Sequence, residues 1–519
     1  MNQPSKYQQA VYDFISNGKG NAVVDAKAGS GKTTTIVEAA KLIPVGNKCV
    51  FLAFNKAIAV ELEKRLPKHV VAKTLNSLGY GAWMNHCSKK SVLDADKTKK
   101  LVRALQTELE KQYQQTSAEA HLEKFMLASN NYMALMGLVT KAKVAGLTPA
   151  GATGVLGLVA DTDQAWIDLA DHYNIELPTN VTGIIALARL ILLRSVRDIA
   201  TIDFDDQFYM SLIYSVRFTQ YDFIFVDEAQ DVSDIQREIL KRSLKSTGRL
   251  IAVGDPNQSI YGFRGSNPES LNLIKADFQA ITLPLSICYR CDKAIIALAQ
   301  ETVPTIEASA TAAEGEVKDL GFIDQKFDYS VFTQTDMVIC RYNAPLISLA
   351  YRLIAKKIAC KVKGRDIAAG LITLIDKLKC SSVERLVVKL NEWLATETRR
   401  ALAKNPDANL DSIQDKYDSL STVIANSPFK TVDALKNEID AMFSDSANGV
   451  LTLSSVHKAK GLESDRVFIL NFSSMPSARA TKAWEIQQEQ NLIYVAVTRA
   501  KHVLLFISDP PKEKEPKGA

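Results

Sequence analysis

The sequence predicts an α/β protein with two parallel-sheet domains, each interrupted by a mainly helical insertion. Short apolar runs alternate with helical patterns in two separate parts of the chain, which is typical of parallel sheets covered by helices. Two long stretches, 87–200 and 365–447, show helical periodicity and few strand signals. The 519 residues suffice for three or four domains, so a minimal binding module is excluded.

The first α/β part begins near the N-terminus and resumes after residue 200. We expect its strands at Asn21–Asp25, Val50–Phe54, Phe223–Val226 and Leu250–Val253, with helices over Lys32–Leu42 and Lys56–Leu66. The second part is expected to hold strands Met337–Cys340, Val467–Leu470 and Val503–Ile507 and the helix Leu346–Lys356.

These elements define the expected domains. The first α/β domain takes 1–86 and 201–284, with its insertion at 87–200; the second takes 285–364 and 448–510, with a smaller insertion at 365–447. The remaining residues, 511–519, are rich in Pro and Lys and are expected to form a disordered tail.

Composition bounds the function classes. With 47% hydrophobic and 23% charged residues, neither a disordered protein nor a fibre is expected. A net charge of +5 permits a polyanionic partner without requiring one. The longest apolar stretch, Gly183–Val196, is broken by Arg189 and Arg194, so no membrane span is expected. Seven cysteines and a start without a secretory leader indicate a cytoplasmic protein.

A phosphate-binding loop is the strongest local motif. Ala26-Lys-Ala-Gly-Ser-Gly31-Lys32-Thr33 lies between a strand and a helix. There the backbone N–H groups can face an anion, Lys32 can reach β and γ oxygens, and the Thr33 hydroxyl can hold Mg²⁺. Ala26 stands where the strict pattern has glycine, so an ordinary glycine-rich turn is the alternative.

Two carboxylates follow a later strand. Asp227 and Glu228 come directly after Phe223–Val226, where a parallel sheet presents ligand groups. Asp227 would hold Mg²⁺ through water, and Glu228 would orient and deprotonate an attacking water. An acidic helix cap is the alternative.

Taken in order, several motifs resemble those of the UvrD/Rep-like superfamily 1 DNA helicases, nearest the subgroup of the F-box DNA helicase. The matching segments span residues 8 to 501 and are Gln8, Gly31-Lys32-Thr33, Ala53 to Lys56, Lys73 to Ser77, Asp227 to Asp231, Gly254 to Gly265, Cys288 to Arg290, Val456 to Glu463 and Tyr494 to Lys501.

The resemblance implies two RecA-like P-loop motor domains that clamp ATP with Mg²⁺ and move along single-stranded DNA. The implied nucleotide-binding residues are Gln8, Ala28, Gly29, Ser30, Gly31, Lys32, Thr33, Thr34, Tyr289 and Glu463. The implied catalytic residues are Lys32, Asp227, Glu228, Gln258, Arg290 and Arg499, with Thr33 and Asp227 at the metal. The implied DNA-binding residues are Phe54, Asn55, Thr74, Asn76, Tyr261, Phe263, Arg264 and His457.

Three features depart from the family pattern or invite another interpretation. Thr34 replaces an arginine that faces the base in UvrD-like motors, which puts selectivity for ATP over GTP in doubt. Asn76 replaces a histidine of its motif, so that DNA contact is uncertain. Cys288 and Cys291 form a CxxC without a second suitably spaced pair, so we expect no metal there.

The sequence therefore predicts an ATP-dependent DNA helicase or translocase. Movement from 3′ to 5′ is implied because Ser259 to Arg264 matches the UvrD-like branch and lacks the Leu-Pro-Pro run of the opposite branch. The alternatives are a DNA-dependent ATPase that strips proteins from single strands and a nucleotide-switched DNA clamp.

The expected partners are single-stranded DNA, duplex junctions and recombinase or replication proteins. We expect a monomer in a bacterial or phage-infected cell, associated with the nucleoid when it is on DNA. From the positions of the motifs in this sequence, we expect neither an F-box nor a nuclease domain.

Overall fold

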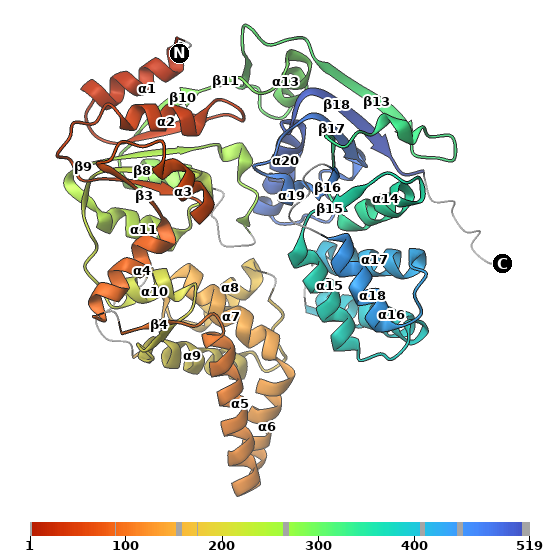
Figure 1. The fold of residues 1–519 in the computed structure, drawn as a ribbon. Coiled ribbons are helices and arrows are strands. Elements are labelled where there is room, and N and C mark those ends of the chain that lie inside the picture. Colours follow the sequence, from red (N-terminus) through yellow and green to blue (C-terminus); the bar gives the residue numbers. More distant parts are fainter. Residues whose placement is uncertain are drawn as a thin grey trace. The chain divides into compact units, whose positions relative to one another are not determined.

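The computed structural model describes residues 3–88, 90–151, 158–173, 175–262, 269–404, 410–443 and 450–510. Its contacts divide the chain into two compact units (Figure 1). The first unit comprises Met1–Ala26 and Gly31–Leu285, and the second comprises Lys27–Ser30 and Ser286–Ala519. Each unit contains a parallel sheet, which confirms the predicted fold class.

The first unit is built on a six-stranded parallel sheet in the order β10-β1-β9-β8-β2-β3. In chain order these strands are β1 (Ala22–Ala26), β2 (Cys49–Ala53), β3 (Val70–Thr74), β8 (Tyr221–Val226), β9 (Leu244–Gly254) and β10 (Ile281–Leu285). Its helices are α1 (Lys6–Asn17), α2 (Lys32–Ala40), α3 (Lys56–Glu63), α4 (Leu75–His86), α10 (Asp206–Ile213), α11 (Asp234–Ser243) and α12 (Ser270–Asp277).

Both faces of this sheet are buried, which explains its continuous apolar strands. On one face Val24 and Phe51 pack with Ile36 of α2, and on the other Val23 and Leu52 join a separate core. Strands β3 and β10 were not predicted from the sequence. These outer strands include exposed Val71 and Pro284 and half-buried Lys73, so they lack the apolar run of a central strand.

The stretch 87–200 is mainly helical, as its periodicity predicts. It contains α5 (Lys97–Thr116), α6 (Glu119–Asn130), α7 (Tyr132–Ala145), α8 (Asp163–His172) and α9 (Val181–Arg197). Two short parallel pairs were not expected: β4 (Val92–Leu93) with β7 (Thr201–Ile202), and β5 (Leu147–Thr148) with β6 (Val159–Ala160). Strands of two residues are too short to leave a periodic signal.

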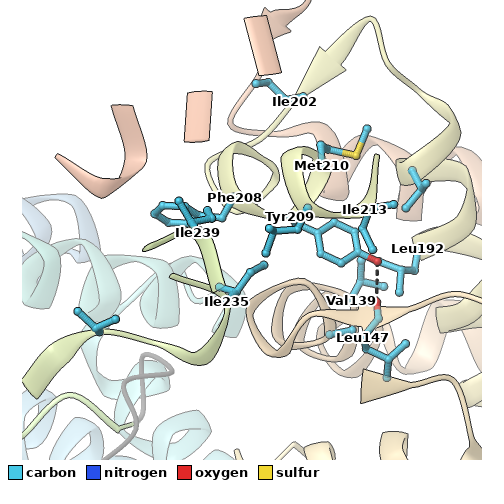
Figure 2. Close-up of a cluster of buried hydrophobic side chains, with 14 of the residues drawn as sticks. Val139, Leu147, Leu192, Ile202, Phe208, Tyr209, Met210, Ile213, Ile235 and Ile239 are labelled. Atoms are coloured by element: carbon cyan, nitrogen blue, oxygen red, sulfur yellow. Dashed lines mark hydrogen bonds between the residues drawn. The ribbon is translucent and has the colours of Figure 1, made fainter. Parts of the chain in front are cut away.

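One continuous core joins this helical stretch to the sheet (Figure 2). Phe208, Met210 and Ile213 of α10 pack in the same cluster as Val139 of α7 and residues of α9 and α11. Within it, the buried Tyr209 hydroxyl donates to the Leu147 carbonyl oxygen at 2.7 Å. Helix α10 therefore attaches the insertion to the sheet domain.

A buried group of charges reinforces this attachment. Lys143 of α7 lies 2.7 Å from Asp203 and 2.8 Å from Asp206, and Lys97 of α5 lies 2.8 Å from Asp206. Burial alone would lower the pKa of Lys143, but Asp206 and Asp203 outweigh it and raise that pKa. The four charges compensate one another inside the protein.

The second unit repeats the architecture with the strand order β13-β18-β17-β14-β16-β15, again parallel. Its sheet strands are β13 (Glu316–Phe322), β14 (Met337–Cys340), β15 (Cys360–Val362), β16 (Leu451–Ser455), β17 (Ser464–Leu470) and β18 (Ala500–Ser508). A short pair, β11 (Ile287–Cys288) and β12 (Glu307–Ala308), precedes them. Strands β14, β17 and β18 were predicted from the sequence, and the other strands of this unit were not.

The helices of the second unit are α13 (Lys293–Gln300), α14 (Asn343–Ala355), α15 (Arg365–Leu378), α16 (Val383–Lys404), α17 (Asp411–Asn426), α18 (Val432–Met442), α19 (Val456–Ala459) and α20 (Ala483–Val497). Helices α15 to α18 occupy the stretch 365–447 and share a core with β14 and β16. No helix in the described ranges is both long and apolar enough to cross a membrane.

Candidate nucleotide and DNA site

The parallel order of the first sheet places the carboxyl ends of β1, β9, β8 and β2 along one edge. The segments that follow these strands carry most of the site residues that the sequence predicted in this unit. This edge is where open α/β sheets bind ligands.

The loop between β1 and α2 has the conformation that phosphate binding requires. Gly29 and Gly31 have φ values of +64° and +76°, in the left-handed region that favours glycine, and α2 begins directly at Lys32. The Lys32 Nζ atom is buried and has no hydrogen-bond partner among the described residues. A buried ammonium group at a helix N-terminus fits an anionic ligand such as a triphosphate.

Thr33 and Asp227 meet as a metal site would require. The Thr33 hydroxyl donates to Asp227 Oδ2 at 3.1 Å. Burial and then the neighbouring Glu228 carboxylate raise the pKa of Asp227 to about 6, although Lys32 and Thr33 oppose the shift. A cation would favour the ionised carboxylate, so this donor set fits Mg²⁺.

Glu228 is held by Gln230, a residue to which the sequence analysis gave no role. The Gln230 amide donates to Glu228 Oε2, and its Oε1 accepts the backbone N–H of Asp255 at 3.0 Å. Gln230 is fully buried. In the sequence, the only indication of a role for Gln230 was its place in the motif Asp227 to Asp231, next to two carboxylates. Its backbone partner Asp255, which directly follows β9, could not be predicted from the sequence.

The turn after β9 positions Gln258. Gln258 Nε2 donates to Asp255 Oδ2 at 2.8 Å, and Asp255 Oδ1 accepts the Asn257 N–H at 3.1 Å. Gly254 allows this turn to approach the segment after β8, because a Cβ atom at Gly254 would lie 2.4 Å from Gln230 Oε1. Glu228 and Gln258 are thus linked through Gln230 and Asp255.

Gln8 and Thr34, which the sequence predicts at the nucleotide, both have side-chain partners. Gln8 of α1 lies by the loop, with its Nε2 donating to Thr35 Oγ1 at 3.3 Å. Thr34 Oγ1 accepts a hydrogen bond from Arg65 Nη2 at 3.4 Å. The guanidinium group of Arg65, which was not predicted as a site residue, therefore lies beside Thr34, the position at which the family pattern has an arginine.

Phe54 and Tyr261 are the aromatic DNA candidates among the described residues. Their ring centroids are 6.4 Å apart with an interplanar angle of 13°, and Phe54 is 48% exposed. They line a pocket of about 200 Å³ that also includes Asp205, Phe208 and Gln236. Burial and then the nearby Asp203 raise the pKa of Asp205 to about 6.

The polar DNA candidates have structural partners. Asn55 caps α3 by accepting the Ile58 N–H at 2.9 Å, and Thr74 caps α4 by accepting the Ser77 N–H at 3.1 Å. Asn76 Nδ2 donates to Gln207 Oε1 at 3.1 Å. The predicted residues Phe263 and Arg264 lie outside the described residues.

In the second unit, the structure brings three predicted residues together. Arg290 Nε pairs with Glu463 Oε2 at 2.6 Å, and Arg290 Nη1 donates to the Thr498 carbonyl oxygen at 3.3 Å. Arg499 is 1% exposed and donates to the carbonyl oxygens of Val495 and Leu462, each at 2.9 Å.

Two further predicted residues of this unit are Tyr289 and His457. Tyr289 is 50% exposed beside Arg290 in the sequence. His457 lies on α19, after β16.

Two parallel α/β units and a loop of this geometry define a P-loop protein with two RecA-like domains. The chain belongs to the UvrD/REP helicase family: the family model of the UvrD/REP helicase N-terminal domain matches residues 7–279, and that of the UvrD-like helicase C-terminal domain matches residues 375–509.

Similar curated proteins carry helicase names. F-box DNA helicase protein 1 of Schizosaccharomyces pombe is 25% identical, covering 93% of this chain and 55% of that protein. DNA helicase II of Haemophilus influenzae is 27% identical, covering 61% and 42%. ATP-dependent DNA helicase UvrD2 of Mycobacterium tuberculosis is 24% identical, covering 54% and 46%. The chain thus spans about half the length of these relatives.

Proposed function

We propose that this chain is an ATP-dependent DNA helicase or translocase that moves on single-stranded DNA from 3′ to 5′ and couples ATP hydrolysis to strand separation. The observation that carries the proposal is the buried Lys32 ammonium group, which has no hydrogen-bond partner among the described residues and lies in the loop before α2. Two carboxylates at the end of β8 complete the required chemistry.

Each catalytic residue that the sequence predicts in the first unit has a role in this proposal. Lys32 and the loop N–H groups bind the phosphates, while Thr33 and Asp227 hold Mg²⁺. When bound, Mg²⁺ neutralises charge that develops on the phosphate oxygens. Glu228, oriented by Gln230, accepts a proton from the attacking water, and Gln258 senses the γ-phosphate.

We propose that Arg290 and Arg499 complete the site from the second motor domain, with Tyr289 stacking on the adenine and Glu463 contacting the ribose. A positioned arginine can increase phosphoryl transfer by roughly 10³ to 10⁵. Both arginines now bond to groups of their own unit, so reaching a phosphate requires them to exchange those partners. Turnover would therefore depend on a change of conformation.

DNA would bind along the same edge of the first sheet. The nearly parallel rings of Phe54 and Tyr261 offer a stacking surface for bases, which contributes roughly 1–3 kcal/mol per base without sequence preference. Asn55, Thr74, Asn76, Phe263, Arg264 and His457 are proposed to contact the strand. Because Gln258 and Tyr261 are three residues apart, nucleotide and DNA would act on the same segment.

We further propose the domain division inferred from the sequence, action as a monomer, and location in the cytoplasm, on the nucleoid when bound to DNA. The proposed partners are single-stranded DNA, duplex junctions and recombinase or replication proteins.

Phosphate release with and without single-stranded DNA tests the proposed chemistry. We expect Lys32→Ala to lose nucleotide-driven activity, and Glu228→Gln to bind ATP while its turnover stops. Glu110→Gln, on the exposed surface of α5, should behave like the unchanged protein. Normal turnover in Glu228→Gln would exclude its role as the base.

Strand separation requires its own assay. Duplexes bearing either a 3′ or a 5′ tail should be unwound only from the 3′ tail, and preference for the 5′ tail would reverse the proposed polarity. Clearance of a recombinase from single strands, without unwinding, would support the protein-stripping ATPase instead.

A further inference from the structure

Cys288 and Cys291 form an adjacent pair of thiols in the second unit. Cys288 ends β11, and Cys291 directly precedes Asp292, the N-cap residue of α13. Their exposed fractions are 0% and 1%. The Cys291 backbone N–H donates to Cys288 Sγ at 3.4 Å, and Cys291 Sγ donates to the Thr498 carbonyl oxygen at 3.8 Å. The turn therefore brings the Cys288 sulfur atom against the backbone of Cys291.

The two sulfurs differ in acidity. The neighbouring Cys291 side chain lowers the pKa of Cys288 to about 7 against the effect of burial, and backbone N–H groups and Arg290 act in the same direction. The pKa of Cys291 is raised, first by the neighbouring Cys288 side chain and then by burial. Burial also raises the pKa of Cys340 to about 12. Cys288 is thus suited to react first, with Cys291 as the resolving thiol.

The pair encloses two residues of the proposed ATP site, Tyr289 and Arg290. A bond between the sulfurs would close a ring around this dipeptide and restrict its backbone. The Arg290 guanidinium group pairs with Glu463, so its position depends on the backbone that the disulfide would restrict.

We propose that Cys288 and Cys291 are a reversible oxidation site, which forms a disulfide with a peroxide and thereby lowers ATP turnover. The second half of this inference rests on the proposed function, while formation of the disulfide does not.

The chemistry balances with hydrogen peroxide as oxidant. The Cys288 thiolate attacks one peroxide oxygen, the O–O bond breaks, and hydroxide leaves, so Cys288 becomes a sulfenic acid. The Cys291 sulfur then attacks Cys288 Sγ, and the sulfenic oxygen leaves as water with the proton from Cys291. The two thiols together lose two electrons to the peroxide. The hydroxide takes up the proton that Cys288 lost on ionisation and becomes the second water. Because both sulfurs are buried, local opening would set the rate.

Peptide mapping of the full chain tests the first half. Trypsin cleaves after Arg290, between the two cysteines, so a disulfide holds peptides 276–290 and 291–293 together until a dithiol reductant separates them. Peroxide-treated protein should yield this linked pair, as should Cys340→Ala, which alters a buried cysteine outside the pair. Cys291→Ala should instead give a Cys288 sulfenic acid that dimedone traps, and Cys288→Ala should give neither product.

Turnover of the same samples tests the second half. Oxidation should lower ATPase activity roughly tenfold or more in the unchanged chain and in Cys340→Ala. The reason is that loss of a positioned arginine can lower the rate of phosphoryl transfer by roughly 10³-fold or more. Reduction should restore it, and Cys291→Ala should keep more of its activity in peroxide.

Each contrary result has a distinct meaning. Absence of the linked peptides, or binding of stoichiometric zinc by the reduced pair, would overturn the oxidation site. Linked peptides with unchanged turnover would overturn the regulatory half alone. If even the reduced chain hydrolyses no ATP, the proposed function fails while the peptide result stands. Thermal unfolding of each variant shows whether it is folded.

Discussion

Asp227 is a buried carboxyl whose surroundings favour its protonated form. Its pKa is raised to about 6 from an ordinary value of 3.8, chiefly by burial. The stability associated with this proton is fully present below the ordinary value and is lost as pH rises through about 6. The nucleotide-free protein therefore carries a cost at neutral pH that a bound cation would offset.

Asp227→Asn should stabilise the nucleotide-free protein at about pH 8, by about 1–3 kcal/mol. The gain should shrink toward about pH 5, where the wild-type carboxyl is mostly protonated. Denaturant unfolding at both pH values measures it. The same substitution should remove Mg²⁺-dependent hydrolysis, and an unchanged stability at about pH 8 would contradict the assigned burial cost.

In the proposed mechanism, Gln230 acts on catalysis through Glu228. Gln230→Met keeps a similar volume but loses both hydrogen bonds, so kcat should fall about tenfold or more while nucleotide affinity changes little. Nucleotide titration and single-turnover hydrolysis separate the two effects. Gln106→Met is a matched control because Gln106 donates to the Ala128 carbonyl oxygen at 3.0 Å, in the insertion. Equal losses of affinity and kcat would argue for a folding defect.

At the scale of elements, the helical insertion is fixed to the first sheet by α10 and by the charges around Lys143. The sequence predicted the helices of this insertion and the phosphate loop, because periodicity and motif spacing are local properties. It predicted neither the ion pairs of Lys143 with Asp203 and Asp206 nor the hydrogen bond of Gln230 to the Asp255 backbone. Such contacts depend on which distant segments the fold brings together.

Lys143→Met should destabilise the first unit by about 3–5 kcal/mol, because it leaves Asp203 and Asp206 buried with less compensation. Chemical unfolding measures this loss. Lys100→Met, which removes the exposed ion pair with Asp94, should have little effect. If both substitutions had equally small effects, the charges would not fix the insertion.

At the scale of the whole molecule, each unit has a core of its own. The tryptophans divide between them, with Trp83 and Trp166 in the first unit and Trp393 and Trp484 in the second. Unfolding is therefore expected to depart from a single two-state transition.

Leu435→Ala, in the core of α18, should lower the stability of the second unit by about 2–5 kcal/mol. Fluorescence from Trp393 and Trp484 should show that the second unit unfolds at a lower denaturant concentration. When both of these tryptophans are replaced by Phe, the remaining fluorescence comes from the first unit, whose unfolding midpoint should be almost unchanged. A shift of equal size in both signals would mean that the units unfold together.

The close approach at Gly254 also sets a limit on variation. Every other amino acid would add a carbon atom where Gln230 Oε1 already lies. A randomised library at position 254, selected for DNA-stimulated ATPase, should therefore recover glycine alone. Substitutions that spare the fold by displacing the Gln230 amide would appear among stable but slow variants.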